Sequence, residues 1–536
     1  MQKVSTAWEN AHKQTLLNES FVEISLDIAD PDAIKDAEAV SNGSIYISDT
    51  PEIVSEVDTP VVPYGTLEQN SWLLDGSRKS IPESDYKDGG YIGDVLSNEE
   101  CVFDKKIPTI TIEFDEAHKQ IIPGITITWG TAYDEYAEHF IVTAYNGDTV
   151  VARTEILSNK SVTSIVSLDI ENYNRITIEV LSWCLPNHRA RVDEIFIGWH
   201  KVYSKRDLMK YNHSQSVDPI STSLPKMEIK FAIDNSDDSY NPYNLNGLAK
   251  YLTERQEVKT RYGLKLNDNT IEWIKGGSFY LSEWYAQQNG ITADFVARDI
   301  LEYMSTTYED NVSSYYNGVF IERDLYTLAE NVLNSAGLPK NSNGSNKWVL
   351  DESLKKIKTS APLPKDTIAN CLQLIANAGC CVLYPDRDGN IHIESIGNTK
   401  SNYEITSFNS YSKSEITLSK PIKQINVEVY TYSMGEKGVE HVLTGKLTPV
   451  GDVGETITID NPLITSEDRA SIVGQWIGNY LKNRMTLKST VRADVKLDAL
   501  DIVTHENNYN TNNIRMTKVD FEFNGAFRGT GEGRVI

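Results

Sequence analysis

Residues 224–244 read LPKMEIKFAIDNSDDSYNPYN, and this stretch decides the fold class. Met227, Ile229, Phe231 and Ile233 recur at every second position, which is the spacing of a β-strand with one buried face. The strand runs into a segment crowded with Asp, Asn and Ser, whose side chains hydrogen-bond to nearby backbone and favour tight turns. The stretch therefore predicts a half-buried strand that ends in a turn.

A second amphipathic strand lies far upstream. In residues 21–28, polar and apolar side chains alternate in the same way. The long segment between the two strands has a different character, with short alternating runs and turn residues between them. Those runs are residues 110–114, 125–129, 140–144, 149–151, 176–181 and 195–197. Between two of them, the pair Asn146-Gly147 predicts a tight hairpin turn, because it tolerates the positive φ angles of a type I′ turn. The spacing of the runs predicts a β-sandwich, so we interpret the two flanking strands as parts of one domain that a second domain interrupts.

Composition limits the class of protein. A chain of 536 residues is too long for one core and predicts several domains. With 40% hydrophobic and 24% charged residues, it has the composition of a globular protein. Lys and Arg number 51 and Asp and Glu 76, and the net charge of −25 disfavours specific binding of nucleic acid or anionic lipid.

Cysteines and apolar runs exclude further classes. The five cysteines show no paired spacing, so neither a disulfide framework nor a zinc site is predicted. Cys371, Cys380 and Cys381 are expected to be buried small side chains. No run reaches the ~18 apolar residues of a membrane span, and residues 1–18 lack a signal-peptide pattern. We expect synthesis in the cytoplasm and no membrane span.

The second half of the chain mixes helices and strands. Asp324 and Asp366 are expected to cap two helices, and residues 381–384 and 391–394 form a strand pair around the turn Asp386–Gly389. Ser466 is expected to cap a third helix. Predicted strands surround that helix at residues 414–431, 439–450, 489–496, 501–504 and 513–523.

Three of these segments resemble phage tail hub proteins. The strand and turn of residues 224–244 resemble the end of the first hub barrel. The helix and hairpin around Asp386–Gly389 resemble the central hub domain, and residues 497–503 with 523–529 resemble the end of a second barrel. The interrupting segment resembles a discoidin or galactose-binding-like jelly roll, on residues 64–68, 72–77, 90–92 and 123–127.

This resemblance implies a mainly β chain with an α+β central part, two tube-like β-barrels and an inserted β-sandwich. The implied domains are residues 1–63 (first barrel strands and connecting arm), 64–200 (jelly roll), 201–305 (remainder of the first barrel), 306–410 (mixed central domain) and 411–536 (second barrel with a helix).

The resemblance also implies a function. Hubs of this family are homotrimers at the tail tip or baseplate of the virion, assembled in the host cytoplasm. Their two related barrels make a pseudo-sixfold ring that adapts a threefold hub to the sixfold tail tube. Implied partners are distal tail and tail tube proteins, the tape measure, and spike or fibre proteins. DNA would pass through without specific binding, and we expect an acidic lumen.

No motif predicts catalysis. The sequence has no nucleophile elbow, zinc-protease helix or phosphate-binding loop, so we expect no enzyme and no cofactor. Asp386, Asp388 and Asn390 have the oxygen spacing of a calcium loop, but Ile391 stands where such a loop needs glycine, which favours a hairpin turn. The acidic residues of 234–238 equally suit turns, and no metal site is predicted.

The jelly roll leaves a carbohydrate site open. Tyr133, Tyr136, Trp183, His188 and Arg189 fall in or beside predicted loops and could stack on and hydrogen-bond a host cell-wall glycan. The alternative is structural: Trp183 and Trp199 lie in the core, and Arg189 and Arg191 pair with nearby acids such as Asp193 or Glu194. Two rival functions follow, a host-surface adhesin that acts through the jelly roll and, less favoured, a tail-associated wall hydrolase.

Overall fold

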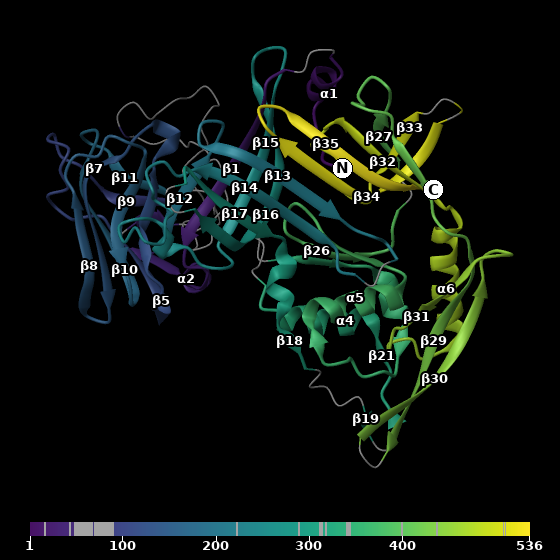
Figure 1. The fold of residues 1–536 in the computed structure, drawn as a ribbon. Coiled ribbons are helices and arrows are strands. Elements are labelled where there is room, and N and C mark those ends of the chain that lie inside the picture. The colour runs from purple at the N-terminus through teal and green to yellow at the C-terminus, as the bar shows by residue number, and fades with distance from the viewer. Residues whose placement is uncertain are drawn as a thin grey trace.

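The computed structural model describes residues 1–14, 18–41, 44–47, 68, 90–220, 223–287, 290–309, 315–316, 319–338, 345–397, 400–435, 438–506, 509 and 511–536. Strands dominate these residues, and one 13-stranded sheet crosses the molecule (Figure 1). The predicted mainly β class is confirmed. Most of the connecting arm and the motifs at residues 64–67 and 72–77 lie outside the described residues.

The 13-stranded sheet contains two β-units of the same strand order. The first β-unit consists of β1 (Ser20–Ala29), β15 (Glu257–Lys265), β16 (Ile271–Ala286), β17 (Thr292–Arg298), β14 (Lys226–Asp234) and β13 (Leu208–Ser216), in this spatial order. The second β-unit consists of β27 (Lys400–Ile405), β33 (Ile502–Glu506), β34 (Thr511–Phe523), β35 (Phe527–Val535), β32 (Met485–Arg492) and β28 (Glu415–Leu418). The two β-units differ in the direction of one strand. β1 runs antiparallel to β15, whereas its equivalent β27 runs parallel to β33.

The two units do not close into the two barrels that the sequence predicted. A barrel needs its last strand to pair with its first. Instead β13 pairs with β34 of the second β-unit, with Tyr211 opposite Phe523 and Gln215 opposite Val519. The described strands therefore form one open sheet, and buried side chains of both units belong to a single hydrophobic cluster.

The strand of residues 21–28 returns to the first β-unit as expected. It is β1, whose apolar side chains Val22, Ile24, Leu26 and Ile28 are buried on the same side as those of β14. The edge strand β12 (Gly198–Tyr203) pairs with β1 and brings the chain back from the interrupting segment. Gly198 has a φ of +140°, and a Cβ there would come within 2.3 Å of the Ile28 carbonyl oxygen.

Two five-stranded sheets make up the interrupting segment and share one core. One sheet contains β2 (Glu38–Ser41), β5 (Thr109–His118), β10 (Tyr173–Trp183), β7 (Ala137–Asn146) and β8 (Thr149–Ile156). The other contains β3 (Ser44–Ile47), β4 (Tyr91–Leu96), β11 (Arg189–Phe196), β6 (Ile122–Trp129) and β9 (Thr163–Ile170). Gly147, with a φ of +57°, forms the predicted turn between β7 and β8. The assignment of the interrupting segment as a discoidin-like jelly roll stays a prediction.

The central part packs helices on small sheets. Its elements include α4 (Leu325–Ser335), α5 (Ile368–Gly379), α6 (Glu467–Lys482), β22 (Trp348–Leu350), β25 (Val382–Pro385), β26 (Ile391–Glu394), β29 (Ile422–Gly435), β30 (Gly438–Pro449) and β31 (Glu455–Ile459). Asp324 and Ser466 cap α4 and α6 as predicted. Thr367, rather than Asp366, caps α5, because its hydroxyl accepts the Asn370 N–H. The buried face of α6 lies in the same cluster as α4 and α5.

Shorter elements complete the chain. They are α1 (Thr6–His12), α2 (Pro31–Asp36), η1 (Thr131–Tyr133), η2 (Ala249–Tyr251), η3 (Ile300–Ser305), η4 (Glu352–Lys356), β18 (Thr307–Tyr308), β19 (Tyr315–Tyr316), β20 (Val319–Phe320), β21 (Arg323–Asp324), β23 (Lys358–Thr359) and β24 (Asp366–Thr367).

Asp299 fastens the end of β17 to the start of β14. Its backbone N–H donates to the Met227 carbonyl at 3.0 Å, and its carboxylate accepts the N–H groups of Met227 at 2.6 Å and Leu301 at 2.8 Å. The side chain is buried, and burial raises its pKa to about 7 despite these hydrogen bonds. The two N–H donors therefore stabilise the ionised carboxylate, whereas its burial away from water destabilises it.

We expect this carboxyl to make stability depend on pH. Because its pKa is about 7 when folded and about 3.8 when unfolded, the folded state binds the proton more tightly. Its contribution to stability is present below about pH 4 and is lost as the pH rises through 7, on the order of 4 kcal/mol in total. Asp299→Asn cannot titrate, so urea unfolding between about pH 4 and 8 should vary less for this variant. Parallel pH profiles for both proteins would contradict the expectation.

Candidate functional site

The two β-units and the central part meet around one buried arginine. Arg387 lies in the turn between β25 and β26, and its side chain is 2% exposed. Its Nε donates to Asp498 Oδ1 at 2.7 Å, while its two terminal nitrogens donate to the Lys275 carbonyl at 3.0 Å and the Leu497 carbonyl at 2.8 Å. One side chain thus connects the central hairpin with β16 of the first β-unit and the segment before β33 of the second.

Asp498 receives several further donors. Gln2 Nε2 donates to Oδ2 at 2.9 Å and Gln215 Nε2 to Oδ1 at 3.2 Å, and the Met1 amine lies 3.2 Å from Oδ2. Burial by itself would raise the pKa of Asp498, but the charges of Arg387 and the Met1 amine, with these hydrogen bonds, lower it to about 2. The carboxylate therefore stays ionised and paired at neutral pH.

Aromatic and imidazole groups continue this polar network into the core of the joined sheet. The hydroxyl of Tyr262 contacts Tyr211 Oη and His213 Nδ1, both at 2.6 Å. His213 is fully buried beside Phe279 and Phe521. Burial, reinforced by the charge of Arg387, lowers the pKa of His213 to about 3. A neutral histidine therefore lies where β13 meets β34.

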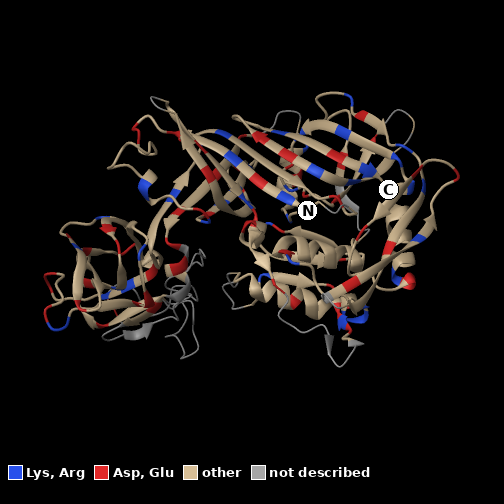
Figure 2. Cartoon of the chain, turned by 60° about the horizontal axis from the view of Figure 1, so that its bottom comes forward, with Lys and Arg blue, Asp and Glu red and all other residues tan. Residues whose placement is uncertain are grey.

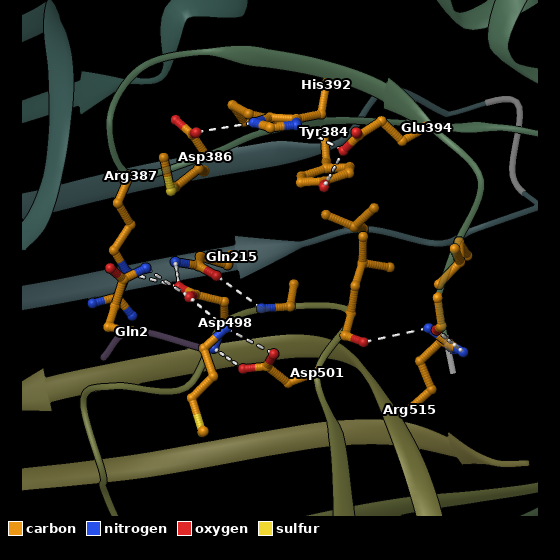
Figure 3. A pocket seen from close by; sticks show the side chains of 18 of the residues that line it. Gln2, Gln215, Tyr384, Asp386, Arg387, His392, Glu394, Asp498, Asp501 and Arg515 are labelled. Atoms are coloured by element: carbon orange, nitrogen blue, oxygen red, sulfur yellow. Dashed lines mark hydrogen bonds and ion pairs between the residues drawn. The ribbon is translucent and has the colours of Figure 1, made fainter. Parts of the chain in front are cut away.

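A pocket of about 390 Å³ opens beside this network (Figure 3). Its labelled lining residues come from the N-terminus (Gln2), β13 (Gln215), the central hairpin (Tyr384, Asp386, Arg387, His392, Glu394), the segment before β33 (Asp498, Asp501) and β34 (Arg515). His392 lies between Asp386 and Glu394, 2.9 Å from an oxygen of each. Burial would lower the pKa of His392, but hydrogen bonds to both carboxylates raise it. Acids and bases in the lining thus largely pair with each other.

The polar face of the long sheet is also paired. Figure 2 shows basic and acidic residues side by side along its strands. Lys230 lies 3.2 Å from Glu228, Lys518 lies 2.9 Å from Asp520, and Lys488 lies 3.1 Å from Glu532. Such pairs, two along a single strand and one between neighbouring strands, neutralise the face locally and leave little net field to hold a phosphate chain.

The residues predicted to bind carbohydrate gather around a buried ion cluster. Glu135 accepts Trp183 Nε1 at 2.9 Å and lies 3.0 Å from His188 Nδ1. Arg191 pairs with both Glu135 and Glu68, at 2.9 and 2.6 Å. We define the Glu135 cluster as Glu68, Glu135, Trp183, His188 and Arg191. The cluster occupies one end of the interrupting segment, between β10 and β11.

The five predicted residues differ in accessibility. Trp183 and His188 are buried, so neither ring has a free face for a sugar. Arg189 pairs with Glu68 at 3.1 Å, and Tyr133 lies against the Arg191 guanidinium at 4.7 Å. Tyr136 is partly buried against the core and donates its N–H to Cys184 Sγ at 3.3 Å. The core position considered for Trp183 is observed, and both arginines pair with acids, Arg189 with Glu68 and Arg191 with Glu68 and Glu135.

Sequence reasoning missed Arg387 and Asp498 as partners. Both residues lay in segments singled out as hub-like, the turn Asp386–Gly389 and the run 497–503, but nothing in either segment showed that the two meet. A charged residue at the tip of a hairpin is usually solvated, so its burial had no local signal.

Within the described ranges, no group of three or more His, Cys, Asp or Glu side chains is arranged to hold a metal ion. Asp386 instead accepts the Asn390 N–H at 2.8 Å, as a hairpin turn requires. No helix in the described part of the chain is long and apolar enough to cross a membrane.

Comparison with known proteins found no matching family model and no matching curated protein. Similar solved structures include two tail proteins. A prophage MuSo2 43 kDa tail protein from Shewanella oneidensis is 13% identical with a TM-score of 0.41, over 62% of this chain and 95% of that one. Prophage tail protein gp18 from Listeria monocytogenes is 9% identical with a TM-score of 0.38, over 62% and 91%.

A third similar structure is a type VI secretion component, the E. coli c3393 protein. It is 7% identical with a TM-score of 0.32, over 62% of this chain and 74% of that one.

Proposed function

We propose that this chain is a structural hub at the tail tip or baseplate of a phage or phage-tail-like particle. The observation that carries the proposal is the repeated β-unit: six strands in one order, twice, joined where β13 pairs with the second half of β34. A homotrimer would place six such units in a ring, which matches a sixfold tail tube while keeping threefold symmetry. The hub-like motifs in residues 224–244 and around Asp386–Gly389 support the same assignment.

An open sheet suits this role. Unpaired strand edges are avoided in soluble proteins unless something covers them, and ring closure would cover β28. On this proposal the partners are tail tube and distal tail proteins, the tape measure, and a spike or fibre. The chain catalyses no reaction. The locally neutralised polar face is compatible with DNA that passes without specific binding, and the acidic lumen stays a prediction.

Native mass spectrometry of the purified protein tests the proposal. A homotrimer has a mass of 3 × 60.2 = 180.6 kDa, and its projection by electron microscopy should show six similar lobes around a central opening. A protein that stays at 60.2 kDa over the whole accessible concentration range, or a ring without six lobes, would contradict it. Carbohydrate binding is tested separately, by a glycan array with the full chain.

A further inference from the structure

The two β-units correspond residue by residue, because each carries the same irregularity. β16 has a bulge between Leu281 and Glu283, and β34 has one between Met516 and Lys518. Next to each bulge lies a residue with a left-handed backbone, Arg255 at φ +69° and Leu500 at φ +75°. These two residues donate their N–H groups to the Leu281 and Met516 carbonyls, both at 2.7 Å. The bulges therefore align the two units without ambiguity.

Starting at the bulge, a row of residues that lie opposite one another on successive strands crosses each β-unit, and the two rows correspond. In the first β-unit it runs through Leu281, Ala297, Ile229 and His213. In the second it runs through Met516, Gly533, Leu487 and Ile416. Strand β28 is thus the equivalent of β13, with Ile416 in the place of His213 and Leu418 in the place of Gln215.

Only one of the two equivalent joins is made within the chain. β13 lies on β34 with His213 opposite Phe521 and Gln215 opposite Val519. β28 ends the path of the described sheet. It leaves Ile416 57% and Leu418 62% exposed. The matching stretch of β16 is Glu283–Ala286, which, among the described strands, pairs only with β17 and holds Tyr285 56% exposed.

We propose that β28 of one copy pairs antiparallel with residues 283–286 of β16 in a second copy, repeating the β13–β34 join between copies. Transferred through the bulge, the register places Ile416 opposite Ala286, Thr417 opposite Tyr285 and Leu418 opposite Trp284. This inference rests on the proposed hub function and names the surfaces that would close its ring.

The chemistry of the two surfaces fits a second copy of this chain. Trp284 and Ala286 already pack at the margin of the joined core, so Leu418 and Ile416 would extend that core.

Paired cysteines test the register. Opposite residues in an antiparallel pair lie roughly 4.5–5.5 Å apart between Cα atoms, within the range of a disulfide. We expect Thr417→Cys with Tyr285→Cys to give covalent dimers and trimers under mild oxidation by oxidised glutathione, read by intact mass. Glu415→Cys with Tyr285→Cys is two residues out of register and should give at least fivefold less. The unsubstituted protein sets the background from its five native cysteines.

Leu418→Asp provides a second measurement. It should raise the concentration at which trimers form by tenfold or more, while Leu447→Asp, at a comparably exposed leucine on β30, should leave it unchanged. Trimers with no excess of in-register cross-link, or an equal response to both aspartates, would overturn this inference and leave the hub proposal standing. Monomers with no cross-link above background at any concentration would overturn both.

Discussion

Replacing Arg387 with alanine is expected to lower the free energy of unfolding by about 3–5 kcal/mol. The substitution removes the cationic partner of the buried Asp498 carboxylate. It also removes the donor to the backbone carbonyls of Lys275 and Leu497. Breaking a buried ion pair from one side costs far more than the pair itself contributes, because the remaining charge stays desolvated. Chemical denaturation followed by circular dichroism measures the loss.

The neighbouring aspartate supplies a matched control. Asp388 lies in the same turn, and its side chain is 67% exposed in a surface pair with Lys275. Asp388→Ala should change stability by less than about 0.5 kcal/mol. Arg387→Lys keeps the charge but not the planar fork, and we expect an intermediate loss. Equal stabilities for the Arg387 and Asp388 alanine variants would show that Arg387 does not hold the three parts together.

Alanine in place of Glu135 is expected to destabilise the interrupting segment by about 3–5 kcal/mol. Glu135 accepts the Trp183 indole N–H and pairs with His188 and Arg191, all of them buried. Its removal would leave these donors without a negative partner in a dry environment. Thermal unfolding followed by tryptophan fluorescence measures the effect, since Trp129 and Trp183 both lie in this core.

Glu138 is the matched control, because it lies three residues further along and is exposed. Glu138→Ala should change the free energy of unfolding of the interrupting segment by less than about 0.5 kcal/mol. The Glu135 variant also separates the two interpretations of this cluster. A stable Glu135→Ala protein that has lost binding on a glycan array would assign these residues to a sugar site rather than to the core.

Local patterns determined much of this protein from sequence alone. The alternation in residues 224–233 predicted β14, the Asn-Gly pair predicted the turn at Gly147, and Asp324 and Ser466 predicted two helix starts. Each of these features depends on residues within a few positions of one another. Period, capping and turn chemistry act over that range, so the sequence carries them directly.

The choice between Asp366 and Thr367 as a cap shows where local reasoning ends. Both residue types cap helices well, and the backbone conformation around them decides which one does. The Asp366 carboxylate instead accepts a hydrogen bond from Asn370 Nδ2 at 2.9 Å. Its backbone takes part in the short pairing of β24 with β18.

Tertiary structure alone decided which strand edges meet and which charges are buried. β13 and β34 lie some 300 residues apart in sequence, as their Ser214–Asp520 hydrogen bond shows, and Arg387 and Asp498 lie 111 apart. The residues beside each of these groups in the sequence do not favour its observed partner over water or over another partner. Only the placement of whole packed units selects one pairing, because burial and desolvation depend on everything that surrounds a group and not on the residues beside it in the chain.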